Sequence, residues 1–251
     1  MFELTNKVAI VTGAAQGIGQ AIAEAFAKQG AIVVPTDRPG VDMEKTCSMC
    51  KSAGAADVFA CELDITIQDS INNAVKTVMD KYGRIDILAQ NAGLNRPKPS
   101  EEITEELWDS IVDVNLRGSF FIAQAVLGIM KKQGKGRIIF TSSQASLVAR
   151  ENQVPYCASK AGINAMVRTL AFDYAKTGIT VNAVAPCFAM TELTRKRLED
   201  PEYGAMVLSM IPVGRLVEPS EVGSLFAFLA SDEAAMITGQ TMVIDGGWTI
   251  W

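Results

Sequence analysis

Residues 7–40 read KVAIVTGAAQGIGQAIAEAFAKQGAIVVPTDRPG, and this stretch decides the fold. A continuous apolar run, residues 8–11, leads into a glycine-rich turn, and an alanine-rich segment with helical character follows. A second apolar run, residues 31–34, ends shortly before Asp37. Strand, glycine turn, helix, strand and acid is the order in which an α/β fold presents backbone N–H groups to the pyrophosphate of a dinucleotide.

Short apolar runs recur along the rest of the chain, with helical stretches between them. Because the runs are continuous rather than alternating, we expect strands that are buried on both faces of a parallel sheet. The predicted fold is α/β, a Rossmann-type doubly wound sandwich of seven parallel strands with helices on both faces. No repeat or linker marks a boundary, so one domain over residues 1–251 is expected. The expected strands are residues 8–11, 31–34, 57–61, 85–89, 137–141, 179–184 and 241–244.

Composition narrows the classes of function. A net charge of −5 and a pI near 5 argue against a nucleic acid or an anionic membrane as partner. We see no signal peptide and no apolar run that approaches the length of a bilayer span, so a cytoplasmic protein is expected. Histidine is absent, which excludes a Ser-His-Asp triad and a His-ligated metal. Cys47 and Cys50 form a C-x-x-C pair with no second pair, so no metal site is expected.

The glycine turn is the predicted cofactor site. Gly13 allows the tight turn off the strand, Gly17 lets the backbone approach the phosphates, and Gly19 lets helix and strand pack closely. Gln16 and Ile18 lie between these glycines, and Gln16 brings no positive charge to the turn. Three glycines alone are weak support, but the flanking strands and helix favour a dinucleotide.

The acid at the end of the second strand predicts which dinucleotide binds. Asp37 can accept hydrogen bonds from both ribose hydroxyls of NAD, and it would repel the 2′-phosphate of NADP. Arg38 is the counter-argument, because a guanidinium could pair with that phosphate. We therefore expect NAD, with NADP the less favoured cofactor.

Two further motifs follow strands. Asp64 closes the third strand region and Asn91-Ala92-Gly93 the fourth, so both fall where adenine and ribose would lie at the carboxyl edge of the sheet. Each could also be ordinary turn chemistry. In the long helix expected at about 104–132, Asn115 is either surface-facing or a buried polar group that needs partners.

A third group of residues predicts acid–base chemistry. Pro155 suits the first turn of a helix, so Tyr156 and Lys160 share one helical face, thirteen residues after Ser143 in the case of the tyrosine. A free tyrosine has a pKa of about 10. A neighbouring ammonium and a cationic nicotinamide would both favour the phenolate and lower that pKa. The alternative is an ordinary surface pair on a helix.

Together these motifs resemble the short-chain dehydrogenase/reductase family over essentially the whole chain. The matching elements, in order and spacing, are Thr12-Gly13-x-x-x-Gly17-x-Gly19, Asn91-Ala92-Gly93, Ser143 and Tyr156-x-x-x-Lys160, with Asn115 at the family's fourth catalytic position. Two departures are Gln90, where the family usually has asparagine, and Cys187, where it usually has glycine.

The resemblance implies a role for each matched residue. Tyr156 would be the acid/base, Ser143 would hydrogen-bond the substrate oxygen, and Lys160 would lower the pKa of Tyr156 and bind the nicotinamide ribose. Asn115 would help hold a water that links Lys160 to solvent. Further implied cofactor contacts are Asp64 and Ile65 at adenine, and the segment from Pro186 to Thr191 at the carboxamide.

The substrate is expected between two loops and a capping segment at about 187–214. Polar side chains in the loops suit a polyhydroxylated or carboxylated substrate, although loops are polar in general. The candidate substrate residues are Asn95, Arg96, Arg150, Asn152 and Cys187.

The Asn95-Arg96 pair and the Asp-Gly-Gly-Trp ending resemble gluconate-type and threitol-type dehydrogenases of the family. We therefore expect NAD-linked interconversion of a secondary alcohol and a ketone on a sugar, polyol or sugar acid. The alternatives are a 3-oxoacyl-carrier-protein reductase and, outside enzymes, an NAD-binding sensor or scaffold. The resemblance also implies a homotetramer or homodimer, in which Trp248 and Trp251 would be interface anchors or core contacts.

Overall fold

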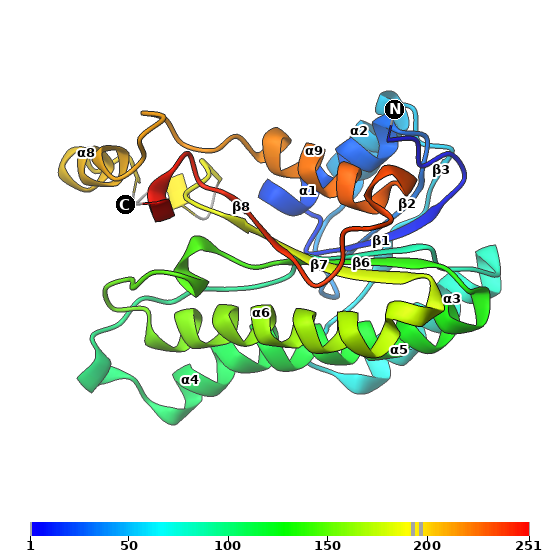
Figure 1. Cartoon of the computed structure of the whole chain (residues 1–251), viewed down its shortest axis with the longest axis horizontal. Coiled ribbons are helices and arrows are strands. Elements are labelled where there is room, and N and C mark those ends of the chain that lie inside the picture. The colour runs from blue at the N-terminus through cyan, green and yellow to red at the C-terminus, as the bar shows by residue number, and fades with distance from the viewer. Residues whose placement is uncertain (1, 192–193, 196–197, 251) are drawn as a thin grey trace.

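The computed structural model describes residues 2–191, 194–195 and 198–250 (Figure 1). Its strands form one parallel sheet in the order β3-β2-β1-β5-β6-β7-β8, with β4 also pairing with β2. The predicted Rossmann-type doubly wound sandwich is confirmed. The strands are β1 (Val8–Thr12), β2 (Ile32–Asp37), β3 (Asp57–Val58), β4 (Cys61–Glu62), β5 (Ile87–Gln90), β6 (Gly136–Thr141), β7 (Ile179–Pro186) and β8 (Thr241–Ile244).

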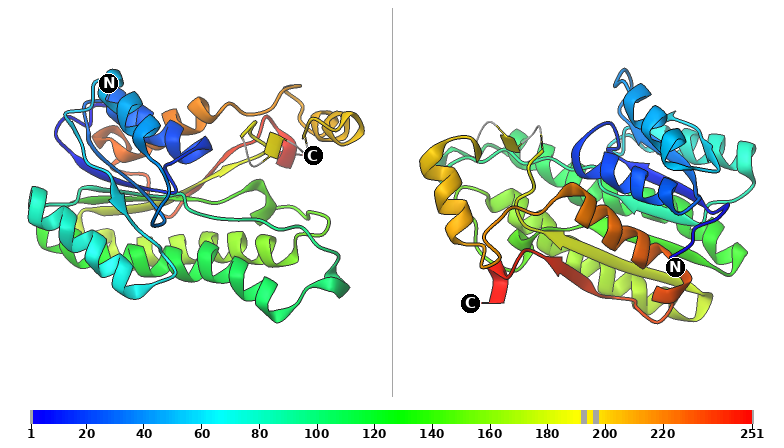
Figure 2. Two further views of the ribbon diagram at one scale, coloured as in Figure 1. Left: turned by 180° about the vertical axis from the view of Figure 1, so that it is seen from behind. Right: turned by 90° about the horizontal axis from the view of Figure 1, so that it is seen from above.

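Helices cover both faces of this sheet, as the front and back views show (Figures 1 and 2). One face carries α1 (Gly17–Lys28), α2 (Glu44–Ala53) and α9 (Pro219–Ala230). The other carries α3 (Gln68–Tyr82), α5 (Ser119–Gln133) and α6 (Val154–Tyr174). The remaining helical elements are α4 (Glu105–Val112), α8 (Pro201–Ser209), η1 (Ser100–Glu102), η2 (Asp113–Gly118), η3 (Gln144–Ser146), η4 (Ala175–Thr177), η5 (Asp232–Ala234) and η6 (Trp248–Ile250).

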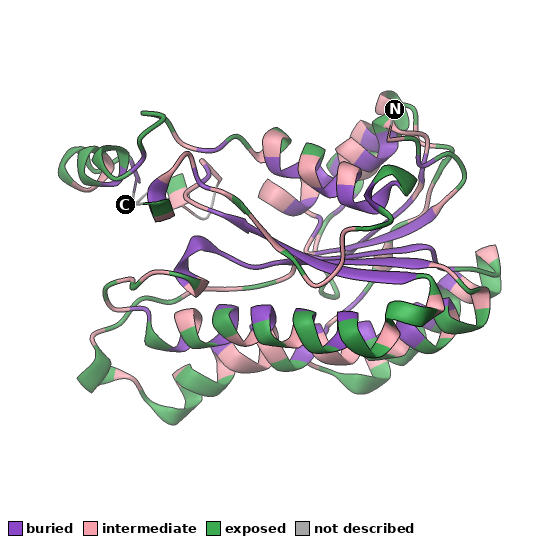
Figure 3. Cartoon of the chain, viewed as in Figure 1, coloured by how far each residue is buried: buried purple, intermediate pink, exposed green. Residues whose placement is uncertain are grey.

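The central strands β1, β2, β5, β6 and β7 are mostly buried because each contributes side chains to two cores (Figure 3). On β1, Val8 and Ile10 pack with α3, α5 and α6, whereas Ala9 and Val11 pack with α1 and α9. Successive side chains of a strand point to opposite faces. The continuous apolar runs are therefore what a sheet covered on both faces requires.

Two elements differ from the sequence prediction. The run at 57–61 is not one strand but two, β3 and β4, and both pair with the edge of β2. Between them Phe59 keeps only a single ladder bond, from its N–H to the Val33 carbonyl at 3.1 Å. The helix expected at about 104–132 is capped by Thr104, and it contains the π-helical segment η2.

One helix bears on the expectation that no apolar run approaches the length of a bilayer span. Within the described chain, the continuous helix Glu105–Gln133 is long and apolar enough to cross a membrane by length and composition alone. Its most apolar window is 44% buried, and α5 packs on the sheet. The core helix of a globular protein passes the same test, so this helix is explained by its place against the sheet.

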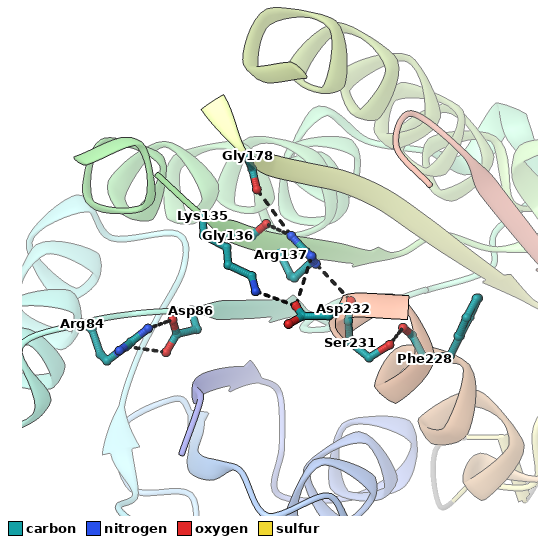
Figure 4. A network of polar contacts seen from close by, with 9 residues as sticks. All are labelled: Arg84, Asp86, Lys135, Gly136, Arg137, Gly178, Phe228, Ser231 and Asp232. Atoms are coloured by element: carbon teal, nitrogen blue, oxygen red, sulfur yellow. Dashed lines mark hydrogen bonds and ion pairs between the residues drawn. The ribbon is translucent and has the colours of Figure 1, made fainter. Parts of the chain in front are cut away.

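A polar network lies at the N-terminal ends of the parallel strands (Figure 4). Arg137, buried at the start of β6, donates from Nε to the Ser231 carbonyl at 3.3 Å and from Nη1 to the Gly136 carbonyl at 3.0 Å. Lys135 pairs with Asp232 at 2.6 Å, and Arg137 lies 3.5 Å from the same carboxylate. Burial lowers the pKa of Arg137, and the opposite charge of Asp232 partly offsets this. The network ties β6 to the end of α9.

A ligand is expected at the C-terminal ends of the parallel strands. The strand order reverses at β1, because β2 lies on one side of it and β5 on the other, and ligands of open α/β sheets bind at such a switch point. Above these strand ends, α8 and the C-terminal η6 lie on the same side of the molecule (Figure 1). They share a small apolar cluster that includes Val207, Ile211 and Trp248.

Candidate active site

A pocket of about 260 Å³ opens at the C-terminal ends of the parallel strands. It brings together residues that the sequence predicted for three separate tasks. Ile18, Pro186 and Thr191 come from the predicted cofactor set, Ser143 and Tyr156 from the predicted catalytic set, and Asn95, Arg150 and Cys187 from the predicted substrate set. The other lining residues are Pro97, Thr141, Ser142, Gln144, Ala145, Gln153, Phe188, Ala189, Thr194, Leu198 and Tyr203.

The glycine turn fits an anion. No side chain caps the start of α1 at Gln16, and the first turn of α1 contains no acidic residue. The free N–H groups and the helix dipole there favour a phosphate. Gly17 has a φ of 58°, and a Cβ on Gly19 would lie 2.0 Å from the Gly13 carbonyl oxygen. The Thr191 side chain faces this turn, 3.3 Å from the position of a Cβ on Gly17.

At the end of β2, Asp37 is held in place by backbone donors. Its carboxylate accepts hydrogen bonds from the N–H of Ala15 at 3.2 Å and of Arg38 at 2.9 Å. The carboxylate therefore lies beside the glycine turn, where the adenosine ribose of a dinucleotide would sit. The Arg38 side chain is exposed. A carboxylate in this place can accept hydrogen bonds from ribose hydroxyls, and it would repel an anionic 2′-phosphate.

The other predicted cofactor residues cluster around the switch point. Asn91 donates from Nδ2 to the carbonyls of Thr12 and Gly13, each at 3.2 Å, and accepts from Thr141 at 3.1 Å. Ala92 packs against Gly13, and a Cβ on Gly93 would lie 3.0 Å from Asn115 Oδ1.

Asp64 and Ile65 are placed differently. The Asp64 carboxylate accepts from the Thr66 N–H at 2.9 Å and the Thr66 hydroxyl at 2.6 Å. The side chain of Ile65 packs into the core on the α5 face. An adenine contact from Ile65 would therefore have to come from its backbone.

The π-helical segment η2 places Asn115. The side chain of Asn115 is fully buried, and it accepts from the Leu94 N–H and donates to the Leu94 carbonyl, both at 2.8 Å. It also donates to Ser159 Oγ at 3.2 Å. Of the two alternatives for Asn115, the buried and bonded group is confirmed. The widened π-helical turn places Asn115 in this position. Such π-bulges recur at functional sites.

Tyr156 lies on the first turns of α6, half-buried, with its exposed part in the pocket. Burial raises the pKa of its hydroxyl, whereas a hydrogen bond with Ser143 and the positive charge of Arg150 oppose that rise. The expected net lowering by Lys160 is therefore not seen in the protein alone. The reason is that the Lys160 ammonium lies 5.7 Å from the ring centroid, and its bonding partner is the Thr141 carbonyl at 2.7 Å.

Lys160 is itself shifted. Burial lowers the pKa of its ammonium to about 8. Lysine has a pKa of about 10.4 in water, so this group has been brought close to neutral pH. Shifts of this kind are typical of functional sites.

The five candidate substrate residues divide into two groups. Asn95, Arg150 and Cys187 line the pocket, but Arg96 and Asn152 do not. Arg96 is exposed, and Asn152 adopts a φ of 60° and uses its carbonyl to accept from the Lys98 N–H at 2.8 Å. Loop membership predicted Asn95, Arg96, Arg150 and Asn152, and Cys187 was predicted as the replacement of the family's usual glycine. The direction of each loop side chain depends on loop geometry that the sequence does not show.

Cys187 occupies the position of the family's usual glycine without backbone strain, because its φ is not in the left-handed region. Burial raises the pKa of its thiol to about 11, so at neutral pH it is a protonated side chain in the pocket wall. All five cysteines are free thiols. Within the described ranges, no three Cys, Asp or Glu side chains gather where they could hold a metal ion.

Arg150 is positioned by two aromatic rings. Its guanidinium carbon lies 4.7 Å from the centroid of Phe188 and 4.9 Å from that of Trp248. Such contacts are worth about 0.5–2 kcal/mol. Trp248 is buried within its own chain, so the core-contact alternative is confirmed for it. Trp251 lies outside the described residues, as do residues 192–193 and 196–197 of the predicted capping segment.

Several pocket and support residues were missed by sequence reasoning. Gln144 and Gln153 line the pocket beside Ser143 and Tyr156, and their closeness in sequence to those two residues could have indicated them. Gln90, noted only as a departure from the family, bonds Thr12 at 2.6 Å and Ser119 at 3.0 Å. No sequence signal marks Ser119, whose hydroxyl donates to the Asn115 carbonyl at 2.7 Å.

Comparison with known proteins agrees with this geometry. Residues 13–249 match the family model described as enoyl-(acyl carrier protein) reductase. A match over nearly the whole chain decides the family. The chain belongs to the short-chain dehydrogenase/reductase family.

As a short-chain dehydrogenase/reductase, it is an oxidoreductase with several well-defined relatives. It is 41% identical to the NAD-dependent glycerol dehydrogenase of Listeria innocua over 99% of this chain and 96% of that one. It is 42% identical to the D-threitol dehydrogenase of Mycolicibacterium smegmatis over 99% of this chain and 95% of that one. It is equally 42% identical to a 3-oxoacyl-[acyl-carrier-protein] reductase of Thermotoga maritima over 98% and 99%.

Solved structures of the family superpose closely. The crystal structure of gox2181 covers 100% of this chain and is itself covered to 98%, with a TM-score of 0.96 and 40% identity. A structure provisionally described as an NAD(P)-dependent gluconate 5-dehydrogenase from Beutenbergia cavernae, with NADP bound at low occupancy, gives a TM-score of 0.94 at 32% identity. It covers 100% of this chain and is covered to 99%.

Proposed function

We propose that this chain is an NAD-dependent dehydrogenase that interconverts a secondary alcohol and a ketone on a sugar, polyol or sugar acid. The observation that carries the proposal is the single pocket that joins Ser143 and Tyr156 to the glycine-turn side through Ile18 and Thr191. Tyr156 is the acid/base. An oxidised nicotinamide, when bound, supplies the hydride acceptor and a positive charge.

Each remaining residue of the tetrad supports that proton transfer. Ser143 shares a hydrogen bond with Tyr156, so it can hold the substrate oxygen next to the phenol. Tyr156 takes the hydroxyl proton of an alcohol, or returns one to the oxygen of a ketone. Lys160, with a pKa near 8, can exchange a proton at working pH, and Asn115 fixes the Leu94 backbone beside it.

NAD is proposed over NADP on the position of Asp37. The glycerol dehydrogenase relative is NAD-dependent, which supports this choice, whereas the gluconate 5-dehydrogenase structure holds NADP. The carboxylate of Asp37 beside the glycine turn supports NAD for this chain, because it would repel a 2′-phosphate.

The sugar or polyol class is proposed over a 3-oxoacyl thioester on the pocket lining. Asn95, Gln153 and Arg150 bring hydrogen-bonding groups to the substrate side, and hydroxyl-rich substrates offer partners for them. The glycerol and threitol dehydrogenase relatives support the same class. A 3-oxoacyl reductase remains the second candidate, because one such enzyme is equally similar in sequence.

Replacement of the acid/base tests the mechanism. Tyr156→Phe removes the hydroxyl and keeps the ring, so turnover should fall by at least about 10³-fold. NAD affinity, measured by calorimetry, should change by less than about threefold because the glycine turn is untouched. Undiminished turnover would contradict the proposed role of Tyr156, and it would leave an NAD-binding sensor or scaffold unsupported as well.

We also propose a homotetramer or homodimer in the cytoplasm. Several large apolar side chains are strongly exposed in the single chain, including Phe172 at 85% and Met236 at 95%. Burial of such side chains between subunits would be favourable. The free cysteines fit a reducing compartment.

A further inference from the structure

One amide in the pocket has unused hydrogen-bonding capacity. Asn95 donates from Nδ2 to Gln153 Oε1 at 2.8 Å. Asn95 Oδ1 is buried, and no described residue donates a hydrogen bond to it. A buried carbonyl oxygen without a partner is unfavourable. A ligand that donates a hydrogen bond at this point would relieve that cost.

The two amides are held rigidly. Leu94, next to Asn95, has both its N–H and its carbonyl bonded to Asn115 at 2.8 Å. On the other side, Gln153 is only 5% exposed, and its carbonyl accepts from the Cys157 N–H at 2.9 Å. The two loops are also joined by the bond from the Lys98 N–H to the Asn152 carbonyl at 2.8 Å. A site pinned from both sides discriminates well, because it cannot relax around a wrong ligand.

The chemistry of the open group selects the ligand. Asn95 Oδ1 needs a donor, which excludes a carboxylate. Arg150 is the charged residue among the described pocket lining, and its positive charge disfavours an ammonium. A neutral hydrogen-bond donor remains, and in a sugar or polyol that donor is a hydroxyl. Gln153 is the N-cap residue of α6, Tyr156 lies in the first turn of that helix, and both line the pocket. A hydroxyl bound here would therefore lie close to the reacting one.

We propose that Asn95 and Gln153 form a hydroxyl-recognition site for the carbon next to the one that is oxidised. The enzyme should therefore prefer a vicinal diol or polyol to a monoalcohol. This inference rests on the proposed function and narrows its substrate class. A 3-oxoacyl thioester carries no hydroxyl at that position.

A matched pair of substrates tests the inference. meso-2,3-Butanediol and 2-butanol differ by the one hydroxyl in question. With NAD, the wild-type enzyme should prefer the diol in kcat/KM by at least about tenfold. Asn95→Leu and, separately, Gln153→Leu should lower kcat/KM for the diol by about ten- to a hundredfold. In both variants, the ratio of kcat/KM for the diol to kcat/KM for 2-butanol should fall by at least about tenfold, because only the diol carries the second hydroxyl.

Lys98→Ala is the matched control. It lies in the same loop, and its exposed ammonium pairs only with Glu102 on the surface among the described residues. It should keep the diol preference. Circular dichroism and NAD affinity monitor folding in all variants.

Three outcomes separate the claims. An equal loss on both alcohols in the leucine variants would show a structural role and overturn the inference. A wild-type enzyme that oxidises both alcohols equally well would also overturn it, with the dehydrogenase assignment intact. If neither alcohol reacts while a 3-oxoacyl thioester is reduced, the proposed function itself fails, and the inference with it.

Discussion

At the scale of single residues, the active site depends on two titratable groups whose pKa values shift in opposite directions, the half-buried Tyr156 and the buried Lys160. Burial raises the pKa of Tyr156 and lowers the pKa of Lys160 to about 8. A neutral phenol and an ammonium that loses its proton readily are suited to passing a proton in either direction. The positive charge of Arg150, held between Phe188 and Trp248, helps the phenolate form.

Burial of Lys160 should change how the stability of the protein depends on pH. Its folded pKa of about 8 lies below the value for the unfolded chain, so above pH 8 the native state releases a proton that the unfolded state keeps. Stability therefore rises with pH in that window. From about pH 7 to about pH 9.5, wild type should gain about 2 kcal/mol relative to Lys160→Met. Urea titrations of both proteins measure this; parallel pH curves would contradict the shift.

At the scale of elements, most of the fold and part of the site were predictable from sequence. Continuous apolar runs predicted the buried parallel strands, and Pro155 predicted the start of the α6 helix. The π-helical segment at Asn115 was not predictable, because its residues fit an ordinary helix and tertiary bonds to Leu94 and Ser159 hold it. The directions of Arg96 and Asn152 were missed for a similar reason, since loop geometry decides them.

Helix α1 packs very closely against the glycine turn at Gly19. A Cβ on Gly19 would lie 2.0 Å from the Gly13 carbonyl oxygen and 2.6 Å from Asn91 Nδ2. Gly19→Ala should therefore destabilise the protein by about 2–4 kcal/mol in urea unfolding and abolish NAD binding. Gly128→Ala is the control, because a Cβ there meets no atom within 4 Å. This control should stabilise α5 by up to about 1 kcal/mol; equal effects of the two substitutions would contradict the packing argument.

At the scale of the whole molecule, the two ends of the parallel strands have different roles. The N-terminal ends carry the network around Arg137 and Asp232 (Figure 4), while the C-terminal ends hold the pocket. The first half of the chain supplies the glycine turn and Asp37, and the second supplies Ser143, Tyr156 and Lys160. The end of the chain returns to the pocket, where Trp248 supports Arg150.

The exposed apolar side chains predict association of whole molecules. Phe172 and Met236 are almost fully exposed in the single chain, and burying them between subunits would be favourable. Light scattering over a range of protein concentrations should give the mass of a dimer or tetramer of the 26.9 kDa chain. A monomer at every concentration would contradict the proposed oligomer.

The central claim is NAD-linked oxidation of a sugar, polyol or sugar acid, and the rate of NADH formation tests it most directly. Glycerol, threitol and gluconate are each offered with NAD and with NADP, and a 3-oxoacyl thioester is offered with NADH and NADPH. We predict turnover of at least one hydroxylated substrate, with kcat/KM at least about tenfold higher with NAD than with NADP. Reduction of the thioester with NADPH, and no oxidation of any hydroxylated substrate, would contradict the account.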